Sequence, residues 1–431
     1  MNSPSISRRS FLAGAVGVGA LGIGASVLKR GPDSVATHAD SPDWLLVNHD
    51  TRNTGYNPRA SGPANDPRVR WRTRRFDADY PVGGYLLQPT PVVVGDQVFV
   101  GGDELSALRV ADGTERWSVT GDDDETFNGT AFADGRIYVT TSRNDAPGIA
   151  VFDATGERGW ARELPVRYAH PLTVVGETVY VPTYDSLLAL DRSSGRRRWQ
   201  FGNTSFVSAQ PAATDDALYA AIGMQGLFAR ERRQDLLAVL SNGPPDVRWQ
   251  YEPGQRAYPS PAVGDDHVFV PETQEWHPEP IEEEARLTAF TLDGEQRWDE
   301  QGGTSGTSPV VADGTVFYKC SINTEKVDMG EYVTRRSDAK VTAHDASDGT
   351  ARWRRTFENL GGWQISPVSD GDRLYVPLYD NVDEKPILIA SDAATGETQW
   401  RFDLDAPAYH LALAGETLYV TTDDGHLYAF E

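Results

Sequence analysis

Eight segments of the chain end on a tryptophan, and this repeat constrains the fold more than any other feature of the sequence. The gaps between successive tryptophans are 46, 43, 39, 50, 49, 55 and 47 residues. A period of about 40–50 residues that contains several short strands is typical of a β-propeller. The eight positions are Trp71, Trp117, Trp160, Trp199, Trp249, Trp298, Trp353 and Trp400. The sequence therefore predicts an all-β fold, an eight-bladed propeller of four-stranded antiparallel blades.

The repeat unit reads as a series of short strands joined by tight turns. Its clearest copy runs from Ser308 to Trp353 and turns at Asp313-Gly314 between two apolar segments. Short alternating segments that are bounded by Asp-Gly pairs are typical of β-hairpins. The middle strand of each unit carries β-branched and aromatic residues, which favour half-buried strands.

Six of the tails have a glycine four residues before the tryptophan. A glycine adopts positive φ angles at little cost, so this position predicts the turn between the third and fourth strands. The tryptophan then places a large ring between neighbouring blades, and all eight are predicted to be structural docking residues. The glycines are Gly113, Gly156, Gly195, Gly294, Gly349 and Gly396.

The tail, of the form Ala-x-Asp-x-x-Thr/Ser-Gly-x-x-x-Trp, resembles the tryptophan-docking motif of pyrroloquinoline quinone (PQQ)-like propeller repeats. Its best copies end at Trp199, Trp353 and Trp400. The resemblance covers residues 44–431 and extends to two groups, the BamB-like assembly lipoproteins and the PQQ-dependent alcohol dehydrogenases. It implies the fold, and it leaves the activity open between these groups.

The two ends of the chain are predicted to close the ring together. The last repeat, Leu411 to Glu431, stops before any glycine turn or tryptophan. Trp71 has no repeat before it. We therefore expect the N-terminal strand near Trp71 to complete the C-terminal blade, which removes the free edges of the sheets.

Residues 1–39 are predicted to be a signal peptide with a short linker, followed by one propeller domain over residues 40–431. Arg8 and Arg9 precede an apolar stretch that ends at Leu28, the pattern of twin-arginine (Tat) export. Cleavage after Ala36 or Ala39 is expected, with a retained membrane segment as the alternative. We expect the protein to be extracellular or associated with the cell surface, with membrane contact only through an uncleaved signal.

The charge of the chain predicts a saline environment. The formal net charge is −23, and only five residues are lysines. This composition resembles halophilic proteins of archaea, whose acidic surfaces are screened at molar salt. Binding of nucleic acid or of anionic membranes is excluded on this balance. We also expect a monomer, and the single Cys320 excludes an intramolecular disulfide.

A ring of polar residues precedes the first strands of the repeats, where a propeller has the mouth of its channel. These residues predict either a pocket floor or simple caps of strand ends around water. The weak candidates for cofactor binding are His170, Gln210, Trp363 and His410, and no catalytic residue is predicted. The full ring is Gln88, Asn128, His170, Gln210, Ser260, Ser308, Ser366 and His410, with aromatic neighbours Tyr85, Phe127, Tyr168, Tyr258, Trp363 and Tyr409.

The resemblance to the PQQ dehydrogenases implies a specific cofactor site that this chain matches poorly. In those enzymes the quinone packs between a tryptophan floor and a vicinal disulfide, beside a Ca²⁺ ion. Trp363 would be the floor, but a chain with one cysteine lacks the vicinal pair. No cofactor is therefore predicted, and PQQ with Ca²⁺ belongs only to an alternative hypothesis.

Three insertions interrupt the repeat and are expected to be long loops that bind partners. They are Ile222 to Gln234, Glu272 to Glu284 and Ser321 to Asp338. In the second, Glu275, His277 and Glu279 are weak metal-binding candidates, with a plain acidic loop favoured. Asp122 to Glu125 is a second weak cation candidate. The lead-in segment, Trp44 to Pro58, is expected to pack across the first blades.

Three functions remain open on the sequence. The favoured hypothesis is an exported, non-enzymatic PQQ-like propeller that acts as a protein-interaction or assembly scaffold at the cell surface. The first alternative is a PQQ- and Ca²⁺-dependent quinoprotein oxidoreductase. The second is an extracellular carbohydrate- or polymer-binding module that uses Trp276, Trp363 and the tyrosines of the channel mouth. The lipid anchor typical of BamB-like proteins is not expected, because no cysteine lies near the signal.

Overall fold

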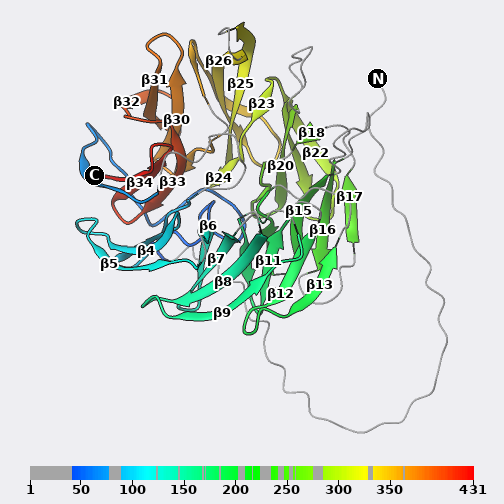
Figure 1. The fold of residues 1–431 in the computed structure, drawn as a ribbon. Coiled ribbons are helices and arrows are strands. Elements are labelled where there is room, and N and C mark those ends of the chain that lie inside the picture. The colour runs from blue at the N-terminus through cyan, green and yellow to red at the C-terminus, as the bar shows by residue number, and fades with distance from the viewer. Residues whose placement is uncertain are drawn as a thin grey trace, which may run out of the picture.

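The described part of the chain is built entirely from short β-strands arranged around a common centre (Figure 1). The computed structural model describes residues 41–76, 89–122, 125–143, 146–166, 169, 171–183, 186–201, 209–215, 217–223, 234–240, 247–251, 256–257, 259–274, 285–328, 333–362 and 365–431. The strands of these residues form eight antiparallel sheets, five with four strands and three whose inner strand is divided into two short pieces. The prediction of an all-β propeller with four-stranded antiparallel blades is confirmed.

We number the sheets 1 to 8 in chain order. Sheets 1 to 4 contain β2 (Val92–Val94), β3 (Gln97–Val100), β4 (Glu104–Arg109) and β5 (Glu115–Thr120); β6 (Thr126–Ala133), β7 (Arg136–Arg143), β8 (Ala146–Asp153) and β9 (Arg158–Glu163); β10 (Thr173–Val175), β11 (Thr178–Pro182), β12 (Leu187–Asp191) and β13 (Arg197–Phe201); and β14 (Ala212–Ala213), β15 (Ala217–Gly223), β16 (Gln234–Leu240) and β17 (Val247–Tyr251).

Sheets 5 to 8 continue the same order. They contain β18 (Arg256–Ala257), β19 (Ala262–Val263), β20 (His267–Gln274), β21 (Arg286–Thr291) and β22 (Gln296–Gln301); β23 (Ser305–Gly306), β24 (Val310–Ala312), β25 (Thr315–Asp328), β26 (Val333–Asp345) and β27 (Ala351–Phe357); β28 (Leu360–Gly361), β29 (Val368–Ser369), β30 (Arg373–Asp380), β31 (Lys385–Asp392) and β32 (Thr398–Asp403); and β33 (Ala408–Ala414), β34 (Thr417–Thr422), β35 (His426–Phe430) and β1 (Val69–Arg74).

The inner strands of neighbouring sheets touch in an unbroken series. The series runs through β2, β6, β10, β14, β19, β24, β29 and β33, and β33 returns to β2. Sheet 8 combines both ends of the chain, because β1 pairs antiparallel with β35 and places Trp71 opposite Ala429. The C-terminal residues thus form three strands of sheet 8, and the N-terminal strand β1 forms its outer strand.

The core lies between the faces of adjacent sheets. The second strand of each sheet is buried on both faces, as at Val98 to Val100, because it is covered by the sheets before and after it. One apolar cluster, for example, joins Phe99 of sheet 1 to Ile137 and Phe152 of sheet 2. Burial on both faces explains why these strands are continuous apolar runs of β-branched and aromatic residues.

Each of the eight tryptophans faces an aromatic ring on the second strand of its own sheet. The partners are tyrosines or phenylalanines, and the ring centroids are 5.8 to 6.5 Å apart. Such tilted aromatic pairs stabilise a fold beyond the area they bury. The repeat therefore places one aromatic pair in every sheet.

Seven of the tryptophans also donate their indole N–H to a backbone carbonyl of the next sheet, at 2.9 to 3.2 Å. The acceptors are Val110, Ala154, Arg192, Leu292, Ala346, Ala393 and Pro63, in the order of their tryptophan donors. For Trp199, the corresponding turn of sheet 4 lies outside the described residues. At Trp400 the acceptor belongs to the segment before β1, because sheet 8 ends before a repeat turn.

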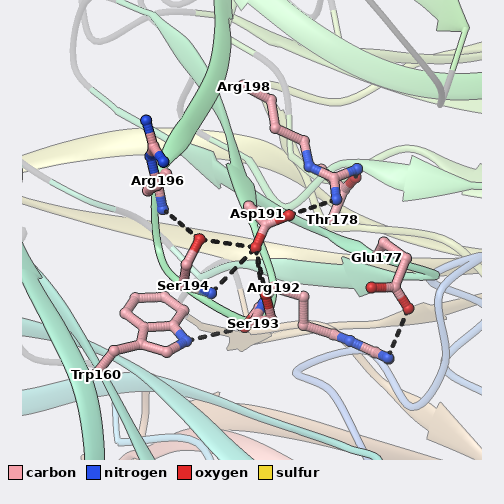
Figure 2. A network of polar contacts seen from close by, with 9 residues as sticks. All are labelled: Trp160, Glu177, Thr178, Asp191, Arg192, Ser193, Ser194, Arg196 and Arg198. Atoms are coloured by element: carbon pink, nitrogen blue, oxygen red, sulfur yellow. Dashed lines mark hydrogen bonds and ion pairs between the residues drawn. The ribbon is translucent and has the colours of Figure 1, made fainter.

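The turns that receive Trp117, Trp160, Trp298 and Trp353 are each organised by an aspartate, as Figure 2 shows for sheet 3. One carboxylate oxygen of Asp191 accepts hydrogen bonds from the amides and hydroxyls of Ser193 and Ser194, at 2.6 to 3.2 Å. Its other oxygen accepts a bond from the Arg198 guanidinium at 2.7 Å. The hydrogen bond from Ser193 and the bond from Arg198 hold the pKa of Asp191 far below its usual range. The turn positions the Arg192 carbonyl for Trp160.

We expect Gly195→Ala to destabilise the protein by about 2–3 kcal/mol, through backbone strain and a clash with Trp160. Gly195 has a φ of +65°, and an added Cβ would lie 2.5 Å from the Trp160 ring. Gly176→Ala is the matched control in the same sheet. Its φ is +53° and no atom lies within 4 Å of its added Cβ, so only the strain of about 1 kcal/mol applies. Denaturant unfolding of both variants measures the difference, and equal losses would contradict the docking contact.

Residues 42–61, which we call the strap, cross the ring along the turns that follow the inner strands. The strap, drawn in blue in Figure 1, makes backbone hydrogen bonds to seven sheets, and β1 follows it along the chain. Its partners in sheets 1, 2, 4, 5, 6, 7 and 8 are Val93, Phe132, Ala213, Val263, Val311, Ser369 and Gly415. The lead-in segment thus reaches far beyond the first blades, where the sequence had placed it.

Two fully buried asparagines of the strap hold neighbouring sheets together. The Asn53 amide donates to the carbonyls of Gln210 and Pro261, at 2.9 and 3.0 Å. The Asn57 amide donates to Leu413 at 2.9 Å, and to Pro42 and Asp43 within the strap. Asn53 has a φ of +57°, a left-handed conformation that asparagine tolerates better than most residues. The strap is therefore an integral part of the core.

Candidate functional site

The two faces of the ring differ in what they carry. The strap and the tryptophan-docking turns lie on the face where the first strand of each sheet ends. The opposite face holds the starts of the inner strands and the turns between the second and third strands. We call it the hairpin face.

Gln210 lies at the start of the first strand of sheet 4, where it ties three sheets together. Its backbone N–H donates to the Ser260 hydroxyl at 3.1 Å, and its side-chain amide donates to the Leu172 carbonyl at 3.3 Å. The residue is almost fully buried. These contacts give it a structural role between sheets 3, 4 and 5. His170 and Trp363, two other candidates for cofactor binding, lie outside the described residues.

The other described members of the polar ring are also buried or partly buried. Asn128, Ser260 and Ser308 are buried, and Ser366 is partly buried. The Asn128 side-chain oxygen is buried without a hydrogen-bond donor among the described residues. Gln88, Tyr85, Tyr168 and Tyr258 lie outside the described part of the chain. The structure therefore brings several polar groups to one end of the ring, but it assigns them no ligand.

His410 is the fourth candidate, and its surroundings keep its ring neutral near neutral pH. It lies beside a bulge in β33, where its backbone N–H donates to the Thr421 hydroxyl at 3.2 Å. The Thr421 hydroxyl in turn donates to the Pro89 carbonyl at 3.1 Å, which links sheet 8 to the start of sheet 1. Burial lowers the pKa of His410 to about 4.

We expect acid to destabilise the protein partly through His410. Between pH 6.5 and 4 the unfolded histidine binds a proton that the folded one does not, so stability falls as the pH falls through this window. His410→Gln removes this loss, and the variant should gain about 1–2 kcal/mol relative to the parent at pH 5. Urea unfolding at pH 7 and pH 5 measures the gain. The matched control is His267→Gln, and an equal gain there would contradict the assignment.

Sequence reasoning missed an acidic group in the same sheet. Asp423 follows β34, and burial raises the pKa of its carboxyl, with the charge of Asp424 adding to the shift. Tyr409 has its pKa raised by burial and by Asp423. Both lie beside His410 at the hairpin face, in sheet 8. Raised carboxyl pKa values occur at functional sites and also within ordinary structural networks. The signal that could have found this group is the Asp-Asp-Gly turn.

The weak metal candidates of the second insertion stay a prediction. Glu275, His277 and Glu279 lie outside the described residues. Glu125 accepts two hydrogen bonds from Arg158, at 3.1 and 3.2 Å, which neutralise its carboxylate. Within the described residues there is no group of three or more histidine, cysteine or acidic side chains that could hold a metal ion.

The residues present do not fit the PQQ site of the alcohol dehydrogenases. That site requires two neighbouring cysteines, and this chain has one. Cys320 is buried in the core of sheet 6, where its thiol donates to the Gly302 carbonyl at 3.2 Å. It cannot cover one side of a quinone in the channel. We therefore derive no chemistry through this cofactor.

Lys319 is a second group that sequence reasoning missed. Only 4% of its side chain is exposed, and its amine donates to the Pro377 carbonyl of sheet 7 at 2.9 Å. Burial lowers the pKa of this amine to about 7. The equivalent residues after the middle triplets of the other sheets are uncharged: Gly101, Thr140, Pro182, Ala221, Pro271, Pro377 and Thr421. That comparison was available from the repeat alone.

The third insertion is a β-hairpin and not a long loop. β25 and β26 have 14 and 13 residues, and they pair from Thr315↔Asp345 to Asp328↔Val333. β27 pairs with β26 only from Ala339 onward. Residues 322–328 and 333–338 therefore form a two-stranded extension of sheet 6, which we call the arm. β-Branched residues, such as Ile322, Thr324 and Val327, favour strands over a loop. The middle parts of the other two insertions lie outside the described residues.

A polar pocket of about 360 Å³ lies where the arm meets sheet 7. Asn381 donates its side-chain amide to the Ser337 carbonyl at 2.7 Å, and the Asn359 backbone N–H donates to Asp338 at 2.6 Å. These bonds fix the base of the arm to the turns of sheet 7. The pocket is lined by Asn323, Glu325, Arg336, Ser337, Asp338, Asn359, Asn381 and Val382.

The described residues include no helix long and apolar enough to cross a membrane.

Comparison with known proteins identifies relatives of the whole ring. The family described as outer membrane protein assembly factor BamB matches residues 63–205, 101–243 and 337–431, which is more than half of the chain. The solved structure of BamB from Moraxella catarrhalis has a TM-score of 0.58 and 16% sequence identity, covering 85% of this chain and 98% of that one. A comparison with curated proteins found no match.

Two further solved structures share the fold. Quinohemoprotein alcohol dehydrogenase from Comamonas testosteroni has a TM-score of 0.63 and 13% identity, covering 93% of this chain and 82% of that one. The computationally designed Ika8 protein has a TM-score of 0.58 and 13% identity, covering 83% of this chain and 99% of that one. At such identities the likeness shows the fold alone, because one fold hosts many activities.

Proposed function

Because the chain belongs to the family described as outer membrane protein assembly factor BamB, we propose that this PQQ-like β-propeller acts as a non-enzymatic scaffold that binds protein partners. The single observation that supports binding on this chain's own surface is the arm, in which β25 and β26 continue past the end of β27, the fourth strand of sheet 6. Rigid sheets that carry a projecting element are a common basis for recognition.

The proposal includes a complete ring and an exported protein. Each of the eight sheets is one blade, and β1 closes the ring, which the unbroken series of inner strands supports. Residues 1–39 direct export by the twin-arginine pathway, and residues 40–431 are one domain. The chain then works outside the cell or at its surface, in a saline medium to which its charge of −23 is suited. The outer-membrane role in the family's description is not part of the proposal.

A photo-crosslinking residue placed at single surface positions tests the scaffold in cells that produce the protein. Val382 beside the arm is 70% exposed, and Val69 on the outer strand of sheet 8 is 37% exposed. We expect adducts of defined mass from position 382 and none from position 69. The absence of any adduct from either position, or an equal smear from both, would count against a scaffold.

An oxidoreductase is the second candidate, supported by the likeness to quinohemoprotein alcohol dehydrogenase. The full chain in molar KCl is incubated with PQQ and Ca²⁺, desalted, and assayed for quinone absorbance and dye-linked alcohol oxidation. Retained quinone with turnover would replace the scaffold proposal. The scaffold proposal expects neither, because the chain lacks the cysteine pair.

A further inference from the structure

The outer edge of β26 offers backbone groups that no described strand pairs with. The Ser337 carbonyl points away from β25, since it accepts the amide of Asn381 in sheet 7. Alternate residues of a strand direct their backbone groups to the same side, so Arg335 and Val333 present theirs on this edge too. Within the described residues, β27 pairs with β26 only from Ala339 onward. The edge from Val333 to Arg335 is therefore open.

This edge leads directly into the polar pocket. Asp338 at its base is already engaged, because its two oxygens accept bonds from Asn323 and from the Asn359 backbone. Arg336 faces Glu384 across 3.9 Å. Glu325 lies opposite Arg336 in the register of β25 and β26, is exposed, and has no ion pair among the described residues. The pocket thus presents an acidic side chain that is available to a cationic group.

An apolar side chain is held at the rim of the same pocket. Val382 is one of two large apolar side chains that are highly exposed in the described chain. Its turn is rigid, because Asp380 accepts the backbone N–H groups of Val382 and Asp383 at 3.0 Å each. Arg401 of β32 donates to the other oxygen of Asp380 at 3.0 Å. A fixed apolar contact beside polar groups is typical of an interface centre.

The geometry points to a strand-addition site: an extended peptide segment of a partner pairs with β26 at Val333 and Arg335 and places a basic side chain in the pocket beside Glu325. Main-chain bonds to an open edge supply affinity, and the pocket supplies specificity. The occupant is a partner segment with a basic side chain, since the pocket presents the acidic Glu325; a second copy of this chain is an outcome of the test. The inference rests on the proposed scaffold function and assigns it a site and a class of ligand.

Peptide binding with site-resolved hydrogen exchange tests the inference on the full chain in KCl. The probes are two short fluorescent peptides of alternating Thr and Val, with Lys or Glu at the centre. We expect the Lys peptide to bind about tenfold more tightly. At saturation the amides of Val333 and Arg335 should exchange about tenfold more slowly, and that of Thr334, which faces β25, should change less.

Two variants separate the backbone and side-chain parts. Arg335→Pro removes one outward N–H at an edge position where proline is tolerated, and should abolish binding. Glu325→Gln leaves the backbone intact and should remove the preference for Lys over Glu. No binding at about 1 mM peptide, equal binding of both peptides, or protection confined to other strands would overturn the inference. Protection of these amides by self-association would also overturn it. Crosslinking at Val382 with none of these signals would leave the scaffold and exclude strand addition.

Discussion

Asn57→Asp is expected to lower the free energy of unfolding by about 3–5 kcal/mol, although it changes a single side-chain atom. The Asn57 amide donates to the carbonyls of Pro42, Asp43 and Leu413, at 2.9 to 3.2 Å, and the residue is fully buried. A carboxylate at this position donates nothing and faces three carbonyl oxygens. It also weakens the bond that joins the strap to sheet 8, where the ring closes.

The introduced carboxyl gives this prediction a pH signature. Burial among carbonyl oxygens raises its pKa above that of the unfolded chain, so the deficit should shrink as the pH falls towards 4. Asn65→Asp is the matched control, since Asn65 is exposed in the same N-terminal segment and should change stability by no more than about 0.5 kcal/mol. Denaturant unfolding in KCl measures both. A deficit that is independent of pH, or equal in the two variants, would show that Asn57 does not hold the strap.

The repeated part of this fold could be predicted from the sequence because the same packing and turn requirements recur along the chain. A tryptophan needs a ring partner and a carbonyl acceptor, and a glycine is needed where the turn has positive φ. The ring partner recurs for all eight tryptophans and the glycine in six of the tails, as at Gly195, whose turn receives Trp160. The pairing of β1 with β35 followed from the same pattern, because Trp71 lacked a preceding repeat. Periodic constraints can thus be found in one sequence without an alignment.

The features that distinguish this chain from a regular propeller lie outside the repeat. The strap reaches seven sheets through backbone bonds, and its residues carry no period that would reveal them. The arm was taken for a loop because it interrupts the repeat and carries charges at Asp328, Arg335 and Arg336. The pocket arises only where the arm meets the turns of Asn359 and Asn381. Contacts between such distant segments depend on tertiary structure and not on local propensity.

Lys319 is the position where the chain departs from its own repeat at a measurable cost. A lysine amine ordinarily has a pKa of 10.5, and burial between sheets 6 and 7 lowers it to about 7. Between these values the unfolded chain binds a proton that the folded chain does not. Stability therefore rises with pH across this window, and below about pH 7 the folded protein must hold a buried ammonium group. The hydrogen bond to the Pro377 carbonyl compensates for only part of this cost.

We expect Lys319→Met to reverse its effect on stability between acid and alkaline conditions. At pH 6 the variant should be more stable than the parent, by up to roughly 3–4 kcal/mol, because no buried charge remains. Near pH 10.5 it should be less stable by about 1 kcal/mol, since the Pro377 carbonyl loses its donor. The measurement is the difference in unfolding free energy between variant and parent at several pH values, which cancels the titration of all other groups. Lys385→Met, at an exposed lysine, is the matched control. A pH-independent difference at position 319 would mean that the amine is solvated, and that sheets 6 and 7 are less tightly packed around it than the structure shows.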